Sequence, residues 1–161
     1  MGSVGQVEQC LHRDYARLVR AVAPAAPTDA DAEDAVQEAF ARAWEQEAKG
    51  QSFERLDAWI VTTALNQLRS RWRHLGVRRR KQPLLVEADV PPMADELLDL
   101  RHAVHALPAR QQEAVVLHYL LGFDITTTAD HLGVAEGTVK SALHRARASL
   151  HAAMTVGDDD E

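Results

Sequence analysis

Apolar residues recur three or four positions apart along most of this 161-residue chain, which is the spacing of amphipathic helices. Prolines and glycines interrupt the pattern at places where a helix must end. In the first half, the pattern predicts helices at about 4–22, 29–49 and 56–75. In the second half, it predicts helices at about 95–106, 108–121, 125–132 and 135–154. The sequence therefore predicts an all-α fold.

The segment 77–94 breaks the helical pattern, since it contains a basic run and three prolines. We interpret it as a flexible linker between two small helical domains, at 1–76 and 95–155. Residues 156–161 form an acidic tail.

The predicted helix at 56–75 has two different sides. One side is apolar and should face the core: Ile60, Ala64, Leu68, Trp72 and Leu75. The other side is polar and basic, and it includes Thr62, Asn66, Arg69, Ser70 and Arg73. Three further aromatic residues of this half are also expected in the core: Phe40, Trp44 and Trp59.

Charge is distributed unevenly, although the net charge is only −6. Residues 29–57 hold nine acids and three bases, whereas residues 66–81 hold seven bases and no acid. The basic segment includes the run at 78–81, where we expect some contact with phosphates. An acidic helix followed by a basic one favours two different partners.

Residues 125–144 fit the spacing of a helix-turn-helix. Ala129 is small where two helices would cross, Gly133 suits the turn, and Val139 would pack the second helix on the first. The outer face of that second helix carries short residues and then donors, as reading of the major groove requires. These residues are Gly137, Thr138, Lys140, Ser141, His144 and Arg145. A solvated helix face is the alternative interpretation.

Several classes of function are disfavoured. The single Cys10, expected to be buried, excludes a disulfide framework within the chain, and His102 with His105 lacks a convincing third metal ligand. We expect no metal, no cofactor and no enzymatic activity, since no catalytic motif is present. No signal peptide or membrane span is visible, so we expect a cytoplasmic protein without membrane insertion.

Four segments in order resemble the extracytoplasmic-function (ECF, group IV) sigma factors of bacterial RNA polymerase: 32–44, 58–66, 106–113 and 136–147. The resemblance implies sigma domain 2, which binds the polymerase clamp and the minus-ten element, and sigma domain 4, which binds the minus-thirty-five element. The implied partners are core RNA polymerase, promoter DNA and, in many family members, an anti-sigma factor.

The resemblance also assigns roles to residues. Polymerase binding falls to Asp34, Gln37, Glu38 and Arg42, which share one helix face. Binding of the minus-ten element is assigned to the polar side of the third helix (Thr62, Asn66, Arg69, Ser70, Arg73). Binding of the minus-thirty-five element is assigned to the outer face of the last helix described above. The sequence departs from the family at Leu65 and Ala142, where a basic residue is usual.

Two other functions fit parts of the sequence. A transcription regulator independent of the polymerase would use only the helix-turn-helix and would leave the first 80 residues unexplained. A degenerate sigma-like protein would bind the polymerase or an anti-sigma factor without promoter activity. Charge reversal at Asp34 and Glu38 separates a sigma factor from the independent regulator.

Overall fold

The structure is a computed structural model that describes residues 4–79 and 95–155, with side chains described for 4–71 and 99–155. The described residues form helices and no strand, so the all-α prediction is confirmed. Most of the predicted linker, the basic run from Arg80 and the acidic tail lie outside the described residues.

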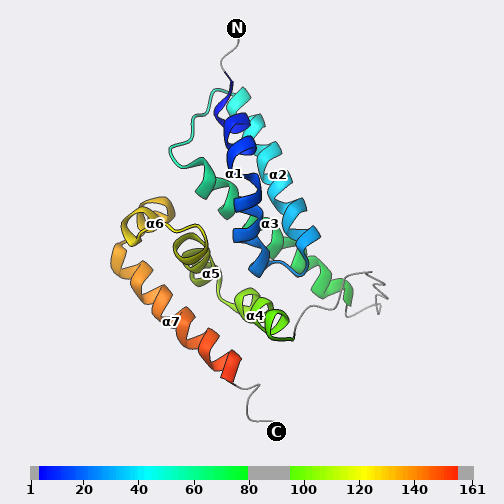
Figure 1. Ribbon diagram of the computed structural model, residues 1–161, viewed down its shortest axis with the longest axis vertical. Helices are drawn as coiled ribbons and strands as arrows, with labels where there is room; N and C mark the ends of the chain where they lie inside the picture. Colours follow the sequence, from blue (N-terminus) through cyan, green and yellow to red (C-terminus); the bar gives the residue numbers. More distant parts are fainter. Residues whose placement is uncertain (1–3, 80–94, 156–161) are drawn as a thin grey trace.

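The first domain consists of α1 (Gln6–Val22), the short η1 (Ala23–Ala25), α2 (Asp29–Ala48) and α3 (Leu56–Arg79), packed side by side (Figure 1). Thr28 caps α2, because its Oγ1 accepts a hydrogen bond of 3.1 Å from the backbone N–H of Asp31. The helix α3 continues four residues beyond its predicted end at 75.

The second domain contains α4 (Asp95–Ala106), α5 (Ala109–Val115), the π-helical turn η2 (Val116–Leu120), α6 (Ile125–Leu132) and α7 (Glu136–Thr155). Gly133 ends α6 with a φ of +68°, a backbone conformation that glycine adopts without strain. The helix-turn-helix lies where the spacing predicts it, with Ala129 and Val139 buried between α6 and α7.

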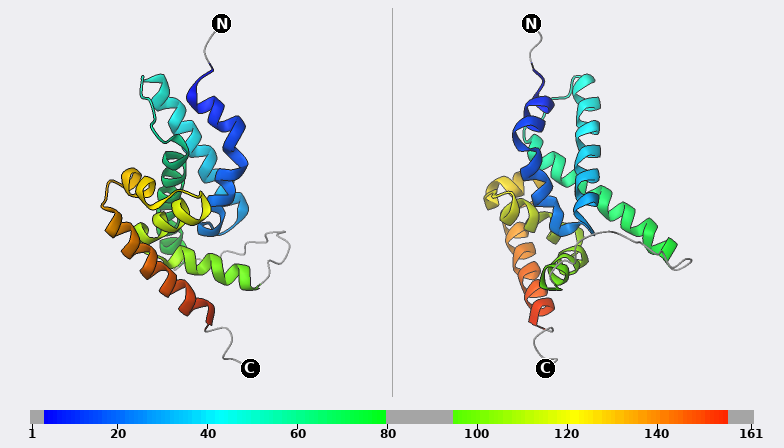
Figure 2. Two further views of the ribbon diagram at one scale, coloured as in Figure 1. Left: turned by 60° about the vertical axis from the view of Figure 1, so that its left-hand side comes forward. Right: turned by 45° about the vertical axis from the view of Figure 1, so that its right-hand side comes forward.

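The two domains contact each other directly (Figure 2). The helix α4 packs on η1, and the turn η2 packs on α1. Val104, Val116, Leu117 and Leu121 of the second domain belong to the same apolar core as α1, α2 and α3. A smaller apolar core lies among α5, α6 and α7.

The predicted core is right in most places and wrong at Trp44. Cys10 and Phe40 are buried, but Trp44 is 42% exposed and Trp59 is half-buried, with its ring against that of Phe53. Trp44 lies outside the core because the small Ala39 and Ala43 fill the contact of α2 with its neighbours. The side chain of Trp72 lies outside the described part of the chain.

The apolar side of α3 is wider than predicted. Ile60, Ala64 and Leu68 are buried as expected, and Val61 and Leu65 are fully buried too. The helix lies between α1 and α2 on one side and the second domain on the other, so burial extends around more of its circumference.

Candidate polymerase and promoter surfaces

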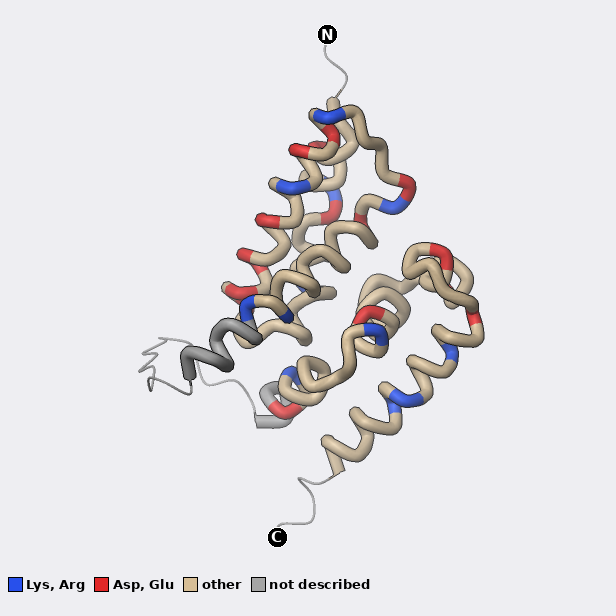
Figure 3. The backbone as a smooth tube through the Cα atoms, turned by 180° about the vertical axis from the view of Figure 1, so that it is seen from behind, with Lys and Arg blue, Asp and Glu red and all other residues tan. Residues whose placement is uncertain are grey.

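The acidic face of α2 is open to solvent. Figure 3 shows acidic residues along the outer edge of this helix. Asp34, Gln37 and Arg42 are exposed, and the Gln37 side-chain amide donates to the Tyr15 hydroxyl at 3.0 Å. Glu38 is partly exposed and holds Arg42, one turn along, at 3.1 Å. The four predicted residues therefore share one accessible face.

A second arginine, Arg71, also contacts this face of α2. The sequence pattern did not assign it to the face. Arg71 extends from α3 and pairs with Glu38 through an Nη2–Oε2 distance of 3.1 Å. Both arginines thus hold the same carboxylate, one by each oxygen. Only the tertiary packing of α3 on α2 brings Arg71 to this place, since the two residues are 33 positions apart.

The predicted polymerase and minus-ten residues meet in one hollow of about 250 Å³ between α2 and α3. Its walls come from both predicted sets and from their neighbours: Glu38, Arg42, Asn66, Gln67, Ser70 and Arg71. Asn66 and Ser70 are exposed beside it. A partner on α2 and a strand of nucleic acid on α3 would therefore lie next to each other.

The rest of the predicted minus-ten face is not free. Thr62 Oγ1 lies 3.3 Å from His131 Nε2 of α6, and Arg69 Nη2 lies 2.9 Å from Glu113 Oε1 of α5. The prediction of an open polar face on α3 is thus incomplete, because the acidic Glu113 offers Arg69 a charge partner within the chain. The side chain of Arg73 lies outside the described residues.

The outer face of α7 is open along its length. All six predicted residues are exposed: Gly137, Thr138, Lys140, Ser141, His144 and Arg145. The inner face packs through Val139, Leu143 and Ala146, which are at most 3% exposed. Ala142 is also buried, so this position belongs to the inner face and would hold any side chain away from the outer surface.

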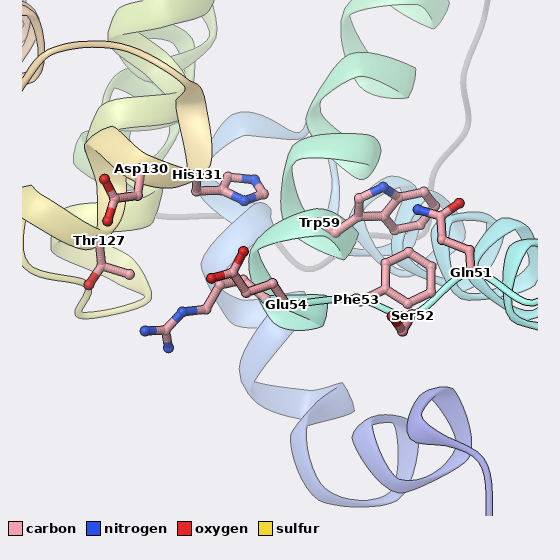
Figure 4. A pocket seen from close by; sticks show the side chains of 9 residues that line it. Gln51, Ser52, Phe53, Glu54, Trp59, Thr127, Asp130 and His131 are labelled. Carbon is pink, nitrogen blue, oxygen red and sulfur yellow. The ribbon is translucent and has the colours of Figure 1, made fainter.

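A pocket of about 290 Å³ opens between the two domains (Figure 4). The chain from Gln51 to Arg55, together with Trp59, forms one wall, and Thr127, Asp130 and His131 of α6 form the other. Burial lowers the pKa of His131, against the opposing effect of Asp57 and Glu113. The imidazole therefore favours its neutral form here.

No group of three or more His, Cys, Asp or Glu side chains within 4–79 and 95–155 is arranged to hold a metal ion. Among the helices of the same ranges, none combines the length and apolar character needed to cross a membrane.

Two family models match the chain. The model for Sigma-70 region 2 matches residues 10–78, and the model for Sigma-70, region 4 matches residues 97–150. The first covers α2 and most of α1 and α3, and the second covers the helix-turn-helix.

Curated relatives support the same family. The ECF RNA polymerase sigma factor SigM of Mycobacterium tuberculosis is 33% identical over 149 residues, which are 89% of this chain and 74% of that protein. The RNA polymerase sigma-E factor of Streptomyces coelicolor is 28% identical over 163 residues, 99% of this chain and 92% of that protein.

Solved structures agree with the fold. The sigma factor RpoE of Bartonella quintana, in complex with the anti-sigma factor NepR, has a TM-score of 0.69 and 28% identity, covering 95% of this chain and 99% of its own. CnrH, in complex with the cytosolic domain of CnrY, has a TM-score of 0.64 at 24% identity, which supports the fold alone. The chain belongs to the ECF RNA polymerase sigma factors, and its function is that of a sigma factor in transcription initiation.

Proposed function

We propose that this chain, as a group IV sigma factor in the cytoplasm, divides polymerase binding and promoter recognition among three helices. The exposed face of α2 binds core RNA polymerase, the polar face of α3 binds the minus-ten element, and the outer face of α7 binds the minus-thirty-five element. Catalysis is left to the polymerase. The proposed domain bounds are 1–76 for sigma domain 2 and 95–155 for sigma domain 4, joined by 77–94.

The separation of two charged surfaces carries this proposal. The acidic edge of α2 and the basic residues along α7 lie on opposite sides of the molecule (Figure 3). An acidic helix repels DNA phosphates and suits a basic protein surface, whereas Lys140 and Arg145 beside the short Gly137 suit a major groove. One chain can therefore hold a protein and a DNA duplex at the same time.

Binding to core polymerase tests the α2 assignment. We expect the purified chain to co-elute with bacterial core RNA polymerase at one-to-one stoichiometry in size-exclusion chromatography. The double variant D34K/E38K should lose co-elution, because two lysines would face a basic partner. The matched control E8K/E136K makes the same change of charge at exposed acids outside this face and should still co-elute. Far-UV circular dichroism of both variants should match that of the unmodified chain.

The competing functions predict other results. A folded chain that fails to co-elute would favour the regulator that works without polymerase. A chain that co-elutes but starts transcription from no promoter in a genomic library would favour the degenerate interaction protein. Loss of co-elution in the control as well would show that overall charge, rather than the α2 face, governs binding.

An anti-sigma factor is a further proposed partner. The Bartonella quintana relative was solved with one, and it matches 95% of this chain at 28% identity. Co-purification of the tagged chain from its native cells should therefore capture a small regulatory protein that competes with core polymerase for the chain.

A further inference from the structure

Arg69 is occupied by partners within the chain. Its guanidinium donates to the side chains of Asn66, Gln112 and Glu113, with Nη2–Oε1 of Glu113 at 2.9 Å and Nη1–Oε1 of Gln112 at 3.5 Å. The side chains of Arg69 and Glu113 are only 15% and 13% exposed. This ion pair is therefore poorly screened by solvent, and three of the five N–H donors of the guanidinium already point at acceptors within the chain.

The second domain supplies these acceptors from an ordered position. Gln112 is 1% exposed, and its amide nitrogen donates to the backbone carbonyl of Val104 at 3.2 Å, which fixes the side-chain oxygen toward Arg69. Glu113 also lies 3.5 Å from Arg110, one turn earlier on the same helix. Contacts within the second domain thus orient the side chains of Gln112 and Glu113 toward Arg69, independently of Arg69 itself.

Other contacts join the same two domains. Arg17 of α1 donates to the backbone carbonyl of Leu121 at 3.0 Å, and Arg55 lies over the ring of Phe123 at 5.8 Å. Arg101 of α4 pairs with Asp29 at the start of α2. Together with the shared apolar core, these contacts pack the second domain against the part of α3 that carries Thr62 and Arg69.

The other predicted DNA surface is not covered. Each of the six residues assigned to the outer face of α7 is exposed in the same arrangement that covers Thr62 and Arg69. In this closed arrangement, with the two domains packed together, the proposed DNA surface of α7 is open and that of α3 is partly blocked.

We propose that the second domain is an intramolecular lid on the minus-ten face of α3, latched by the Arg69–Glu113 ion pair, while α7 stays available to duplex DNA. This rests on the proposed role of α3. A DNA phosphate and the Glu113 carboxylate compete for the same guanidinium, so single-stranded DNA binds α3 only after the domains separate. The closed chain engages the minus-thirty-five element first, and the polymerase or the DNA strand must then open the lid.

Interdomain distance tests the latch without any DNA. Donor and acceptor dyes are attached to cysteines introduced at Glu45 of α2 and Ser149 of α7, both exposed. The native Cys10 is buried, and burial raises its pKa to about 11, which disfavours the reactive thiolate. Labelling therefore favours the introduced cysteines. The full chain is then compared with E113K, with the matched control E8K, and with the charge swap R69E/E113K.

We expect E113K to lower energy transfer, with the open-to-closed ratio rising at least about tenfold, because the introduced lysine would face Arg69 and Arg110. E8K should behave as the unmodified chain, and R69E/E113K should recover transfer. Unchanged transfer in a folded E113K would overturn the latch. Should circular dichroism show that E113K loses helix, E113Q replaces it. An open-to-closed ratio that stays unchanged in a folded E113Q overturns the proposal equally.

The lid function is tested with a fluorescein-labelled, mixed-sequence, 12-nucleotide single-stranded DNA. E113K should bind it severalfold more tightly than E8K, which carries the same net charge, so bulk electrostatics cancels in the comparison. Opening without this gain would reject the DNA-binding role of α3 and hence the lid as a cover of that face, whereas absence of opening rejects the latch itself. A duplex probe should bind both variants equally through α7.

Discussion

Ala142 shows how one side chain limits a DNA-binding surface. The family usually carries a basic residue here, and the alanine of this chain is 7% exposed, within the small core formed by α5, α6 and α7. Its neighbours Val139 and Ala146 are buried as well. The position that lacks the basic residue is therefore a tightly packed one. A longer side chain at 142 would have to displace the neighbouring side chains.

Replacing Ala142 with Arg should destabilise the second domain rather than restore a DNA contact. We expect a loss of about 1–3 kcal/mol in the free energy of unfolding, since an overpacked core costs that much and the charge must reach solvent. Urea unfolding followed by circular dichroism measures it. Ser141→Arg, exposed one residue earlier, should stay within about 0.5 kcal/mol. Equal stability of the two variants would contradict the packing argument.

At the scale of elements, the turn between α6 and α7 sets the direction of the DNA-facing helix. Gly133 has a φ of +68°, and its N–H donates to Asp130 O at 3.3 Å, while the N–H of Val134 donates to Ala129 O at 3.1 Å. These bonds close the last turn of α6. A Cβ at Gly133 would meet nothing within 4 Å, so only the backbone conformation demands glycine.

Gly133→Ala should therefore cost about 1 kcal/mol of stability, the strain of a left-handed alanine. Gly137 is the matched control: it lies inside α7, and a Cβ there also has open space, so Gly137→Ala should be neutral or stabilising by up to about 1 kcal/mol. Thermal unfolding of both variants measures the difference. A stabilising Gly133→Ala would show that the turn does not need its left-handed residue.

At the scale of the whole molecule, contact between the domains places a histidine in a partly buried position. His131 of α6 lies 3.3 Å from Thr62 of α3, and burial lowers its pKa below the ordinary value of 6.5 although Asp57 and Glu113 act to raise it. A histidine whose pKa is lowered by folding binds fewer protons when folded than when unfolded. Its effect on stability therefore depends on pH.

We expect the free energy of unfolding to fall as the pH drops below about 6.5, because the unfolded chain then takes up a proton that His131 resists in the folded state. His131→Gln should weaken this dependence, and thermal midpoints between pH 7.5 and 5.5 give the comparison. His105, whose pKa is lowered by burial and by His102, contributes equally in both proteins and cancels. Identical pH profiles would exclude His131 as a cause.

The candidate surfaces were predictable to different extents. Exposure of α7 at all six assigned residues follows from helical periodicity, and so does the open face of α2. The long-range partners, Glu113 of Arg69 and Arg71 of Glu38, were not predictable, because these contacts join residues 44 and 33 positions apart. Spacing within one helix says which residues share a face, but it does not say what that face will meet.

The fold divides in the same way. Periodicity, the capping Thr28 and the turn at Gly133 are local features, so the linear pattern is enough to place the helices and the helix-turn-helix. Packing of the second domain on α3 depends on residues that are far apart in the sequence. It results from the summed burial of Val116, Leu117 and Leu121 and from charge pairing across the interface. This packing leaves the proposed DNA surface of α7 open and partly covers that of α3. No local sequence pattern predicts it.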